Sequence, residues 1–297
     1  MKPQTTLVIP HKEQPHDELQ VSQPVAGKPL NIGKGFEALS FKHEQFNGLM
    51  DPLVMVDHYT MTSPTFGAHP HAGMSAVSIL FEDSEGIFNN RDSLGNNIDL
   101  LPGDAYWLMA GRGAIHDEKP TQGSRTHGLQ IFVNLPQSHK HDAPISKHIA
   151  SHAIPVMTGE GYRVRVVMGE SNGTKGATSP ALPFTALDAY LDAEGAYSHA
   201  VRSHQSLMVY AVSGDINIRL GELETQLPEQ QAMTIQVGST AQSLHLTSAD
   251  QSHFVILQGA PIREPFIQEG PFVMSNIKEL QQVTAAYEAG QLGSISE

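Results

Sequence analysis

Residues 102–118 read PGDAYWLMAGRGAIHDE, and this stretch combines a turn, a strand, a glycine-rich loop and a second extended segment. Its first three residues, Pro-Gly-Asp, are typical of a turn, and the apolar run that follows has the length of one strand. Gly111 and Gly113 can adopt the positive φ angles that a tight loop needs. The stretch therefore indicates a β-rich fold in which a loop delivers His116 and Glu118 to a barrel mouth.

Short apolar runs of this kind recur along the whole chain. They are rich in β-branched or aromatic residues and are separated by clusters of Gly, Pro, Asn and Asp. Such regular spacing predicts a β-sandwich or β-barrel rather than alternating strands and helices. The predicted strands are 53–56, 76–81, 106–109, 129–135, 164–168, 207–212, 233–237 and 254–257.

One helix is predicted near the C-terminus, at residues 276–289. Asn276 is followed three residues later by Glu279, which is the capping-box pattern, and apolar residues at helical spacing come next. Gly290 stands where a glycine commonly terminates a helix. We expect this helix to be structural and to pack on a β-domain.

The length of 297 residues predicts two domains of ordinary size. Residues 75–88 and 206–218 share an outline of strand, glycine-containing turn and strand, and each is followed by another apolar strand. This similarity indicates a duplicated β-module. We place the first domain at 1–140 and the second at 141–297.

The composition restricts the classes of partner and of chemistry. The net charge of −13 disfavours direct binding to nucleic acid, and the absence of cysteine excludes thiolate ligands and disulfides. The apolar run at residues 7–9 is too short for a signal peptide or a membrane span. We therefore expect a cytoplasmic monomer whose partners are small molecules or proteins.

Two histidine-containing segments have the spacing of metal ligands. In an extended chain residues i and i+2 point to the same side, so His69 and His71 can reach one ion, and so can His116 and Glu118. Pro70 restricts the first segment to a strand start or a sheet edge. Either pair alone could equally be solvated or hydrogen-bonded histidines. Together they would place three nitrogens and one oxygen around an ion such as Fe, Mn, Ni, Cu or Zn.

Five stretches give the chain a resemblance to the pirin family, from about residue 51 to residue 276 and beyond. They are HPHAGMSAV (69–77), NRDSLGN (90–96), PGDAYWLMAGRGAIHDE (102–118), GLQIFVNLP (128–136) and GAPIREPFIQEGPFVMSN (259–276). The resemblance implies an all-β fold of two tandem cupin barrels, which are double-stranded β-helices, with a short C-terminal helix. It also implies one divalent metal, expected to be Fe(II), in the N-terminal barrel.

Carried over residue by residue, the family's ligands are His69, His71, His116 and Glu118, the same four that the spacing selects. The chain departs from the family pattern at Ala72 and Ser75 after the first pair, and at Asn90, where pirins often have histidine. These changes leave the ligands in place and are expected to alter the wall of the pocket.

The resemblance implies a quercetin 2,3-dioxygenase-like oxidoreductase that acts on a flavonol-type substrate. A small aromatic substrate and dioxygen would then be its partners, and Glu118 would be both ligand and general base. The alternative is a redox-sensitive regulatory protein that binds protein partners without turnover. A metal-free bicupin scaffold is a third interpretation.

The remaining candidate residues are interpreted as structural. The second half has no His-x-His pair, so its histidines at 199, 204, 245 and 253 predict a barrel without metal. Trp107 is expected in the core, and Asp57-His58 in a satisfied structural role. Gln130 and Phe132 share one face of a strand; core or cross-strand roles are predicted for both, and lining the cavity is the alternative.

Overall fold

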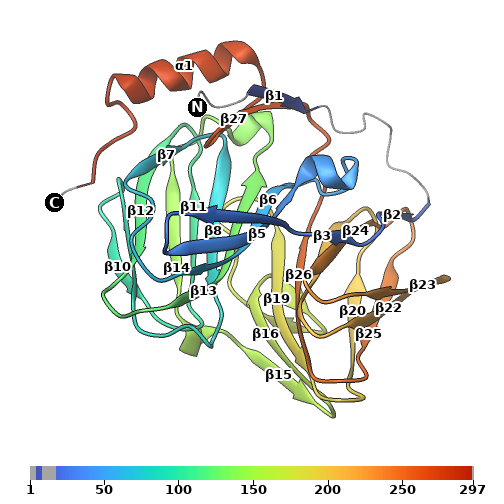
Figure 1. The fold of residues 1–297 in the computed structure, drawn as a ribbon. Coiled ribbons are helices and arrows are strands. Elements are labelled where there is room, and N and C mark those ends of the chain that lie inside the picture. Colours follow the sequence, from blue (N-terminus) through green and yellow to red (C-terminus); the bar gives the residue numbers. More distant parts are fainter. Residues whose placement is uncertain (1–4, 9–17, 296–297) are drawn as a thin grey trace.

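The computed structural model describes residues 5–8 and 18–295, and this part of the chain forms two β-barrels and one α-helix (Figure 1). In the first barrel a seven-stranded sheet and a four-stranded sheet face each other, with antiparallel pairing throughout. The large sheet contains, in order, β14 (Ile145–Ile149), β11 (Ala105–Met109), β8 (Met74–Leu80), β13 (Thr126–Asn134), β6 (Leu53–Met61), β5 (Phe36–Lys42) and β4 (Lys28–Ile32). The small sheet contains β10 (Asn97–Leu100), β9 (Phe88–Asp92), β12 (Ala114–Pro120) and β7 (His69–His71).

The second barrel repeats this plan. Its large sheet contains β15 (Val156–Gly159), β16 (Tyr162–Met168), β19 (Phe184–Leu191), β26 (Ser252–Gly259), β21 (Ser206–Ser213) and β24 (Gln231–Gln236), with β2 (Gln20–Val21) and β3 (Val25–Ala26) both paired to β24. Its small sheet contains β20 (Ala196–Val201), β25 (Gln242–Thr247), β22 (Ile216–Leu220) and β23 (Leu223–Leu227). The order β11-β8-β13-β6 returns as β24-β21-β26-β19, so the duplication predicted from residues 75–88 and 206–218 is confirmed.

All eight predicted strands are present, in β6, β8, β11, β13, β16, β21, β24 and β26. These are the inner strands of the two large sheets, which explains why their apolar runs are continuous: residues on both faces are buried. Trp107 lies in the core where the two large sheets pack together, as predicted, and its ring meets Phe184 of the second barrel edge to face. A small hairpin of β17 (Glu170–Ser171) and β18 (Thr174–Lys175) extends from the second barrel.

The C-terminal segment returns from the second barrel to the first, where its helix lies above β7 and β12 in Figure 1. It comprises β27 (Phe266–Glu269), β28 (Phe272–Met274) and α1 (Ile277–Glu288), and β1 (Thr5–Val8) pairs with β27. Asn276 caps α1 by accepting the amide hydrogen of Glu279 (3.0 Å), and Gly290 follows with φ +69°, so the predicted helix is confirmed. No helix in the described ranges is long and apolar enough to cross a membrane.

Sheet membership does not follow the two sequence halves strictly. β2 and β3 precede the first barrel in sequence but pair with the second, whereas β14 follows residue 140 and pairs with the first. The domain boundary between residues 140 and 141 stays a prediction.

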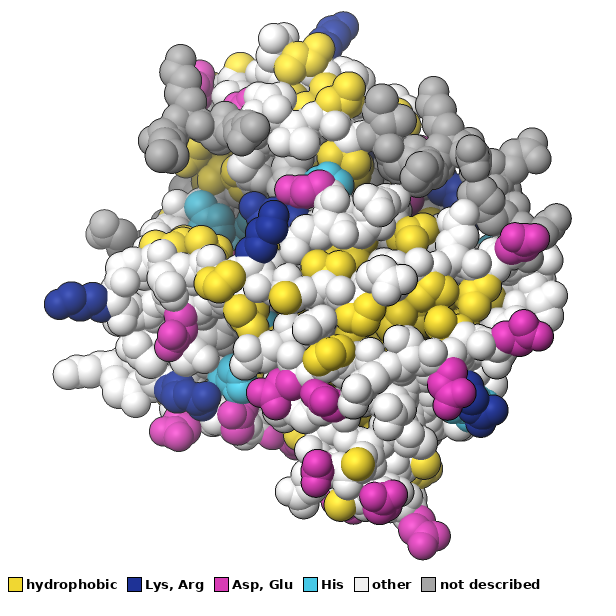
Figure 2. Space-filling model, turned by 45° about the vertical axis from the view of Figure 1, so that its right-hand side comes forward, with side chains coloured by type: hydrophobic (Ala, Val, Ile, Leu, Met, Phe, Trp, Pro, Cys, Tyr) yellow, Lys and Arg dark blue, Asp and Glu magenta, His cyan; other side chains and the backbone are white. Residues whose placement is uncertain are grey.

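The surface reflects the acidic composition. On the face shown in Figure 2, acidic side chains are spread widely, Lys and Arg stand singly, and hydrophobic side chains form a band across the middle. Among the described residues of this face there is no basic patch of the kind that binds a phosphate backbone.

Polar groups bridge the two barrels within the apolar interface. His58 of β6 contacts the Tyr210 hydroxyl through Nδ1 (2.5 Å) and His127 through Nε2 (2.7 Å). The buried Arg165 donates to Asp188 (2.6 Å) and also to the carbonyl oxygen of Gly103 in the first barrel. Burial lowers the pKa of His58 to about 3, and the nearby His127 adds to this effect.

This shift predicts that acid weakens the fold through His58. An imidazole with a pKa near 3 in the folded protein and about 6.5 in the unfolded chain stabilises the fold fully above pH 6.5, and this contribution is lost as the pH falls toward 3. We expect His58→Gln to reduce the pH dependence of the free energy of unfolding by up to about 1.4 kcal/mol per pH unit. Urea unfolding at pH 7.5, 6 and 5 measures this slope. His152→Gln, at an exposed histidine, is the control, and an unchanged slope in the His58 variant would contradict the prediction.

Candidate metal centre

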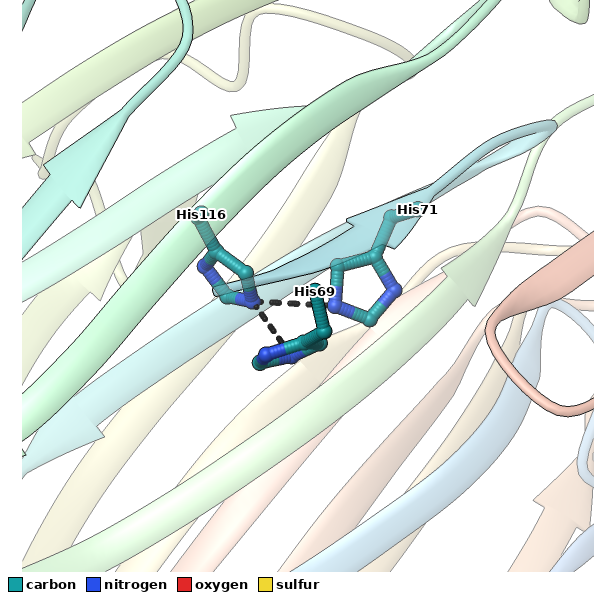
Figure 3. A group of neighbouring side chains, drawn as sticks. All are labelled: His69, His71 and His116. Carbon is teal, nitrogen blue, oxygen red and sulfur yellow. Dashed lines mark hydrogen bonds between the residues drawn. The ribbon is translucent and has the colours of Figure 1, made fainter. Parts of the chain in front are cut away.

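Antiparallel pairing of β7 with β12 brings the two predicted ligand segments together. His69 faces His116 across the ladder, and His71 faces Ala114. β7 is the edge strand of the small sheet, which is the position that Pro70 tolerates. Gly111 and Gly113, with φ +50° and +138°, form the loop between β11 and β12 as predicted. The two histidines of β7 and the one of β12 therefore point to a common centre (Figure 3).

The three imidazoles approach one another through their Nε2 atoms. His116 Nε2 lies 2.9 Å from the Nε2 atoms of both His71 and His69, and potential ligand atoms of all three lie within 4.8 Å of one another. His69 Nδ1 is 2.9 Å from the carbonyl oxygen of Gly67, so this nitrogen carries the hydrogen and the Nε2 lone pair faces the centre. Nitrogens held at about 2.0–2.1 Å around one metal at right angles are about 3 Å apart, so this spacing fits a transition metal.

Electrostatics favour the same conclusion. Burial lowers the pKa of all three histidines: for His71 to about 3, with His69 contributing, and for His116 well below its usual value. The rings are therefore neutral near pH 7, and neutral imidazole is the form that binds metals. A cation at the centre would remove the unfavourable convergence of nitrogen lone pairs.

Glu118 lies in the same cavity but outside this group of three nitrogens. Its carboxylate accepts the Ser78 hydroxyl (2.7 Å), and one oxygen is 3.9 Å from His116 Nδ1, which is the ring nitrogen facing away from the centre. Burial raises the pKa of Glu118 to about 7, against the effect of the Ser78 hydrogen bond. Its assignment as the fourth ligand stays a prediction.

The histidines open onto a cavity of about 210 Å³ between the two sheets of the first barrel. Gln130, Phe132 and Asp57 line this cavity. Gln130 also bonds across the strands to Ser78 (3.1 Å), and Phe132 packs against a buried apolar cluster, so both residues combine the predicted cross-strand and core roles with a place in the cavity wall. Sequence reasoning missed most of the wall, because alternation along β6 is masked by burial on both of its faces. Besides these residues the lining consists of Leu30, Ile32, Phe36, Met55, Tyr59, Met61, Phe66, His69, His71, Phe88, His116 and Glu118.

The three departures from the family pattern have different surroundings. Ala72 packs against the C-terminal segment. Ser75 shares its face of β8 with Val77 and Ile79, which lie in the core between the barrels, so it points away from the cavity. Neither residue forms part of the cavity wall. Asn90 faces Glu118 across the β9–β12 pair, is fully buried, and has no hydrogen-bond partner for either amide atom among the described residues. Asn90 is not part of the lining either, and its link to the cavity is through its strand neighbour Glu118.

The second barrel fills the corresponding space with apolar side chains. β20 and β25 occupy the places of β7 and β12, and β25 contributes Leu244 and Leu246 to a buried core. His199 of β20 is hydrogen-bonded to Ser171 (2.7 Å) and Gln258 (2.8 Å), and His253 to Asp188 (2.6 Å). Within the described residues, the one group of three or more metal-ligand side chains is His69, His71 and His116.

Both halves of the chain match models of one protein family. The family model described as Pirin matches residues 35–133, and the model described as Pirin C-terminal cupin domain matches residues 186–293. Mouse Pirin is 34% identical over 234 residues, which are 78% of this chain and 80% of the mouse protein. Human Pirin is 33% identical over the same shares of the two chains, 78% and 80%. The chain belongs to the pirin family. The predicted resemblance and the two-cupin fold are therefore confirmed.

Solved structures agree with the pirin fold. A quercetin 2,3-dioxygenase from Acinetobacter baumannii has a TM-score of 0.81 at 24% identity, over 94% of this chain and 99% of that chain. The bacterial pirin YhhW from Escherichia coli, in complex with nickel(II), has a TM-score of 0.59 at 16% identity, over 82% and 99%. At these identities the likenesses establish the shared fold alone.

The geometry predicts that metal binding depends on the three histidines of the first barrel. His71→Ala removes one converging nitrogen, and we expect it to weaken metal binding by more than the roughly 10–100-fold that loss of an outer partner costs. His253→Ala, at a buried histidine of the second barrel, should leave the metal content unchanged. Elemental analysis after loading with Fe(II), on proteins shown to be folded by circular dichroism, measures the difference. An equal loss from both variants would overturn the assignment of one site.

Proposed function

We propose that this chain is a metal-dependent dioxygenase of quercetin 2,3-dioxygenase-like type, which acts on a flavonol-type substrate with iron as its metal. The observation that carries the proposal is the convergence of three neutral imidazoles on one wall of a largely apolar cavity, with His116 Nε2 2.9 Å from Nε2 of both His69 and His71. A site with these ligands and an apolar interior suits a first-row metal and an aromatic substrate.

His69, His71 and His116 would hold the metal, and Glu118 is the proposed fourth ligand. When bound, a first-row metal with open positions supplies Lewis acidity and a path for electrons between a substrate oxygen and dioxygen. In the structure the Glu118 carboxylate lies 3.9 Å from Nδ1 of His116, on the side of that ring away from the centre, so joining the three nitrogens would require a change of its side-chain rotamer.

Glu118 is also the proposed general base. Its pKa, raised to about 7 by burial, matches the pH at which a base transfers protons most effectively. Ser78 holds one of its oxygens (2.7 Å), so the other is available to accept the proton of a substrate hydroxyl. Because Ser78 belongs to the large sheet and Glu118 to the small one, this hydrogen bond fixes the base across the cavity.

The apolar side chains would orient the substrate and keep water away from the reacting atoms. Phe132 meets His71 edge to face, with ring centroids 5.1 Å apart, and Phe66 is close to His69 at 6.3 Å. An aromatic substrate fits between such rings by offset or edge-to-face packing. Phe66 is partly exposed and so marks the opening of the cavity.

The names of structural neighbours support the proposal without deciding it, because one fold hosts many activities. Oxygen uptake by the iron-loaded protein with a panel of flavonols tests it. Glu118→Gln should lower the rate by roughly 10²–10⁴-fold, since it removes the base. Glu222→Gln, at an exposed position of the second barrel, is the control.

Failure of oxygen uptake in a protein that contains iron would overturn the dioxygenase. If such a protein instead retained a protein partner only in one iron oxidation state, the regulatory alternative would replace it. A protein that took up no metal at all would leave the bicupin scaffold as the interpretation.

A further inference from the structure

A row of polar side chains crosses the inner face of the large sheet, on the side of the cavity that lies opposite the histidines. In the pairing register of the large sheet, Tyr106, Ser78, Gln130, Asp57 and Ser40 are successive neighbours on β11, β8, β13, β6 and β5. Residues paired in this way lie side by side and point to the same face of a sheet. The row therefore forms a polar band across the inner face of the sheet, and Gln130 and Asp57 are the members of this band that line the cavity.

Two side chains, one in this band and one beside it, each have a buried oxygen atom without a hydrogen-bond partner among the described residues. Asp57 is 7% exposed, and its Oδ1 atom has no hydrogen-bond partner in the described part of the chain. Tyr59, two residues further along β6, is 2% exposed, and its hydroxyl is likewise without a partner there. Both side chains line the cavity. By contrast, Ser78 and Gln130 are hydrogen-bonded to each other (3.1 Å).

Buried polar atoms without partners are rare in folded proteins, because each one loses its hydrogen bonds to water without gaining one in the protein. Here two of them share one face of one strand and border the cavity, where a ligand can reach them. Ser40, the neighbour of Asp57 on β5, can serve one oxygen of the carboxylate, while Met55, Met61 and Phe36 line the cavity beside Asp57 and Tyr59. A ligand hydroxyl could donate to Asp57 and accept from Tyr59, which would satisfy both atoms.

We propose that Asp57 and Tyr59 form a second anchor in the cavity, opposite the three histidines, which selects aromatic substrates that carry a hydroxyl group away from the metal-binding oxygens. The inference rests on the proposed function in one respect: the substrate must occupy this cavity with its other end toward the histidines. A polyhydroxylated flavonol can contact a metal at the histidines and also hydrogen-bond to Asp57 and Tyr59. A flavonol with the chelating oxygens alone can contact only the metal. Sites built to hydrogen-bond a substrate hydroxyl reject analogues that lack it, because the buried groups then stay unpaired.

The test compares two probes on the nickel-loaded protein without oxygen, so that binding is measured apart from turnover. Quercetin carries hydroxyl groups on all of its rings, whereas 3-hydroxyflavone has only the chelating pair of oxygens. Absorbance titration gives the dissociation constant of each probe. We expect Asp57→Ala to reduce the preference for quercetin over 3-hydroxyflavone by about tenfold, the effect of one hydrogen bond to a charged group.

Tyr59→Phe removes a single oxygen atom and provides a second variant if Asp57→Ala does not fold. It should reduce the same preference by about two- to tenfold. Asp250→Asn, at an exposed carboxylate of the second barrel, is the matched control. Metal content is measured for every variant, since a change in preference at constant nickel content is the result that a purely structural role would not produce.

An unchanged preference in both variants would overturn the anchor, whatever the enzyme activity. The two proposals fail separately. Discrimination between the probes that depends on Asp57, together with no oxygen uptake by the iron-loaded protein, would support the anchor and overturn the dioxygenase. Oxygen uptake together with the same preference for quercetin over 3-hydroxyflavone in wild-type and variant proteins would support the dioxygenase and overturn the anchor.

Discussion

The pairing of β7 with β12 is the constraint on which the candidate centre depends. A shift of one residue in this register would turn His69 and His71 to the opposite face of the sheet, since side chains alternate along a strand. β7 has only three residues and lies at the sheet edge, so its own ladder is a weak restraint. The register must therefore be fixed by what packs on the outer side of β7.

The C-terminal segment supplies that restraint. Val273 donates its amide hydrogen to the carbonyl oxygen of Ala72 (3.0 Å), directly after the second histidine of β7. The buried Lys140 donates to the carbonyl oxygens of Gly73 and Val273 (2.8 Å each) and to the Asn134 side chain (2.6 Å), and thereby joins the segment to the turn after β7. Burial lowers the pKa of Lys140 to about 7, so these acceptors have to offset a large desolvation penalty. The geometry of the histidines is thus coupled to residues about 200 positions away in sequence.

Local sequence signals predicted the elements correctly, and the three histidines could be found because i, i+2 spacing is itself a geometric statement. The wall opposite them could not be found in this way. β6 is a central strand with the cavity on one face and the core between the barrels on the other. Both faces are buried, so the sequence pattern does not reveal that Asp57 lies in the cavity and His58 in the interface between the barrels. Ser75 was expected near the cavity because it closely follows His69 and His71 in sequence. Successive residues of a strand point to opposite faces, and the face of Ser75 becomes clear only from the register of β8. The contribution of the C-terminal segment rests on long-range packing, which leaves no periodic signal.

The two barrels show how one topology serves stability in one copy and chemistry in the other. In the second barrel the inner face of β25 presents Leu244 and Leu246, and the interior is closed by apolar packing. In the first, the equivalent strand presents His116 and Glu118, and the interior retains a cavity whose lining includes unpaired polar atoms of Asp57 and Tyr59. Each of these features lowers stability relative to a filled core. These features are concentrated around one cavity, in the barrel that packs against the C-terminal segment and against the core of the second barrel. Such a local loss of stability, compensated elsewhere in the fold, is expected at a binding site.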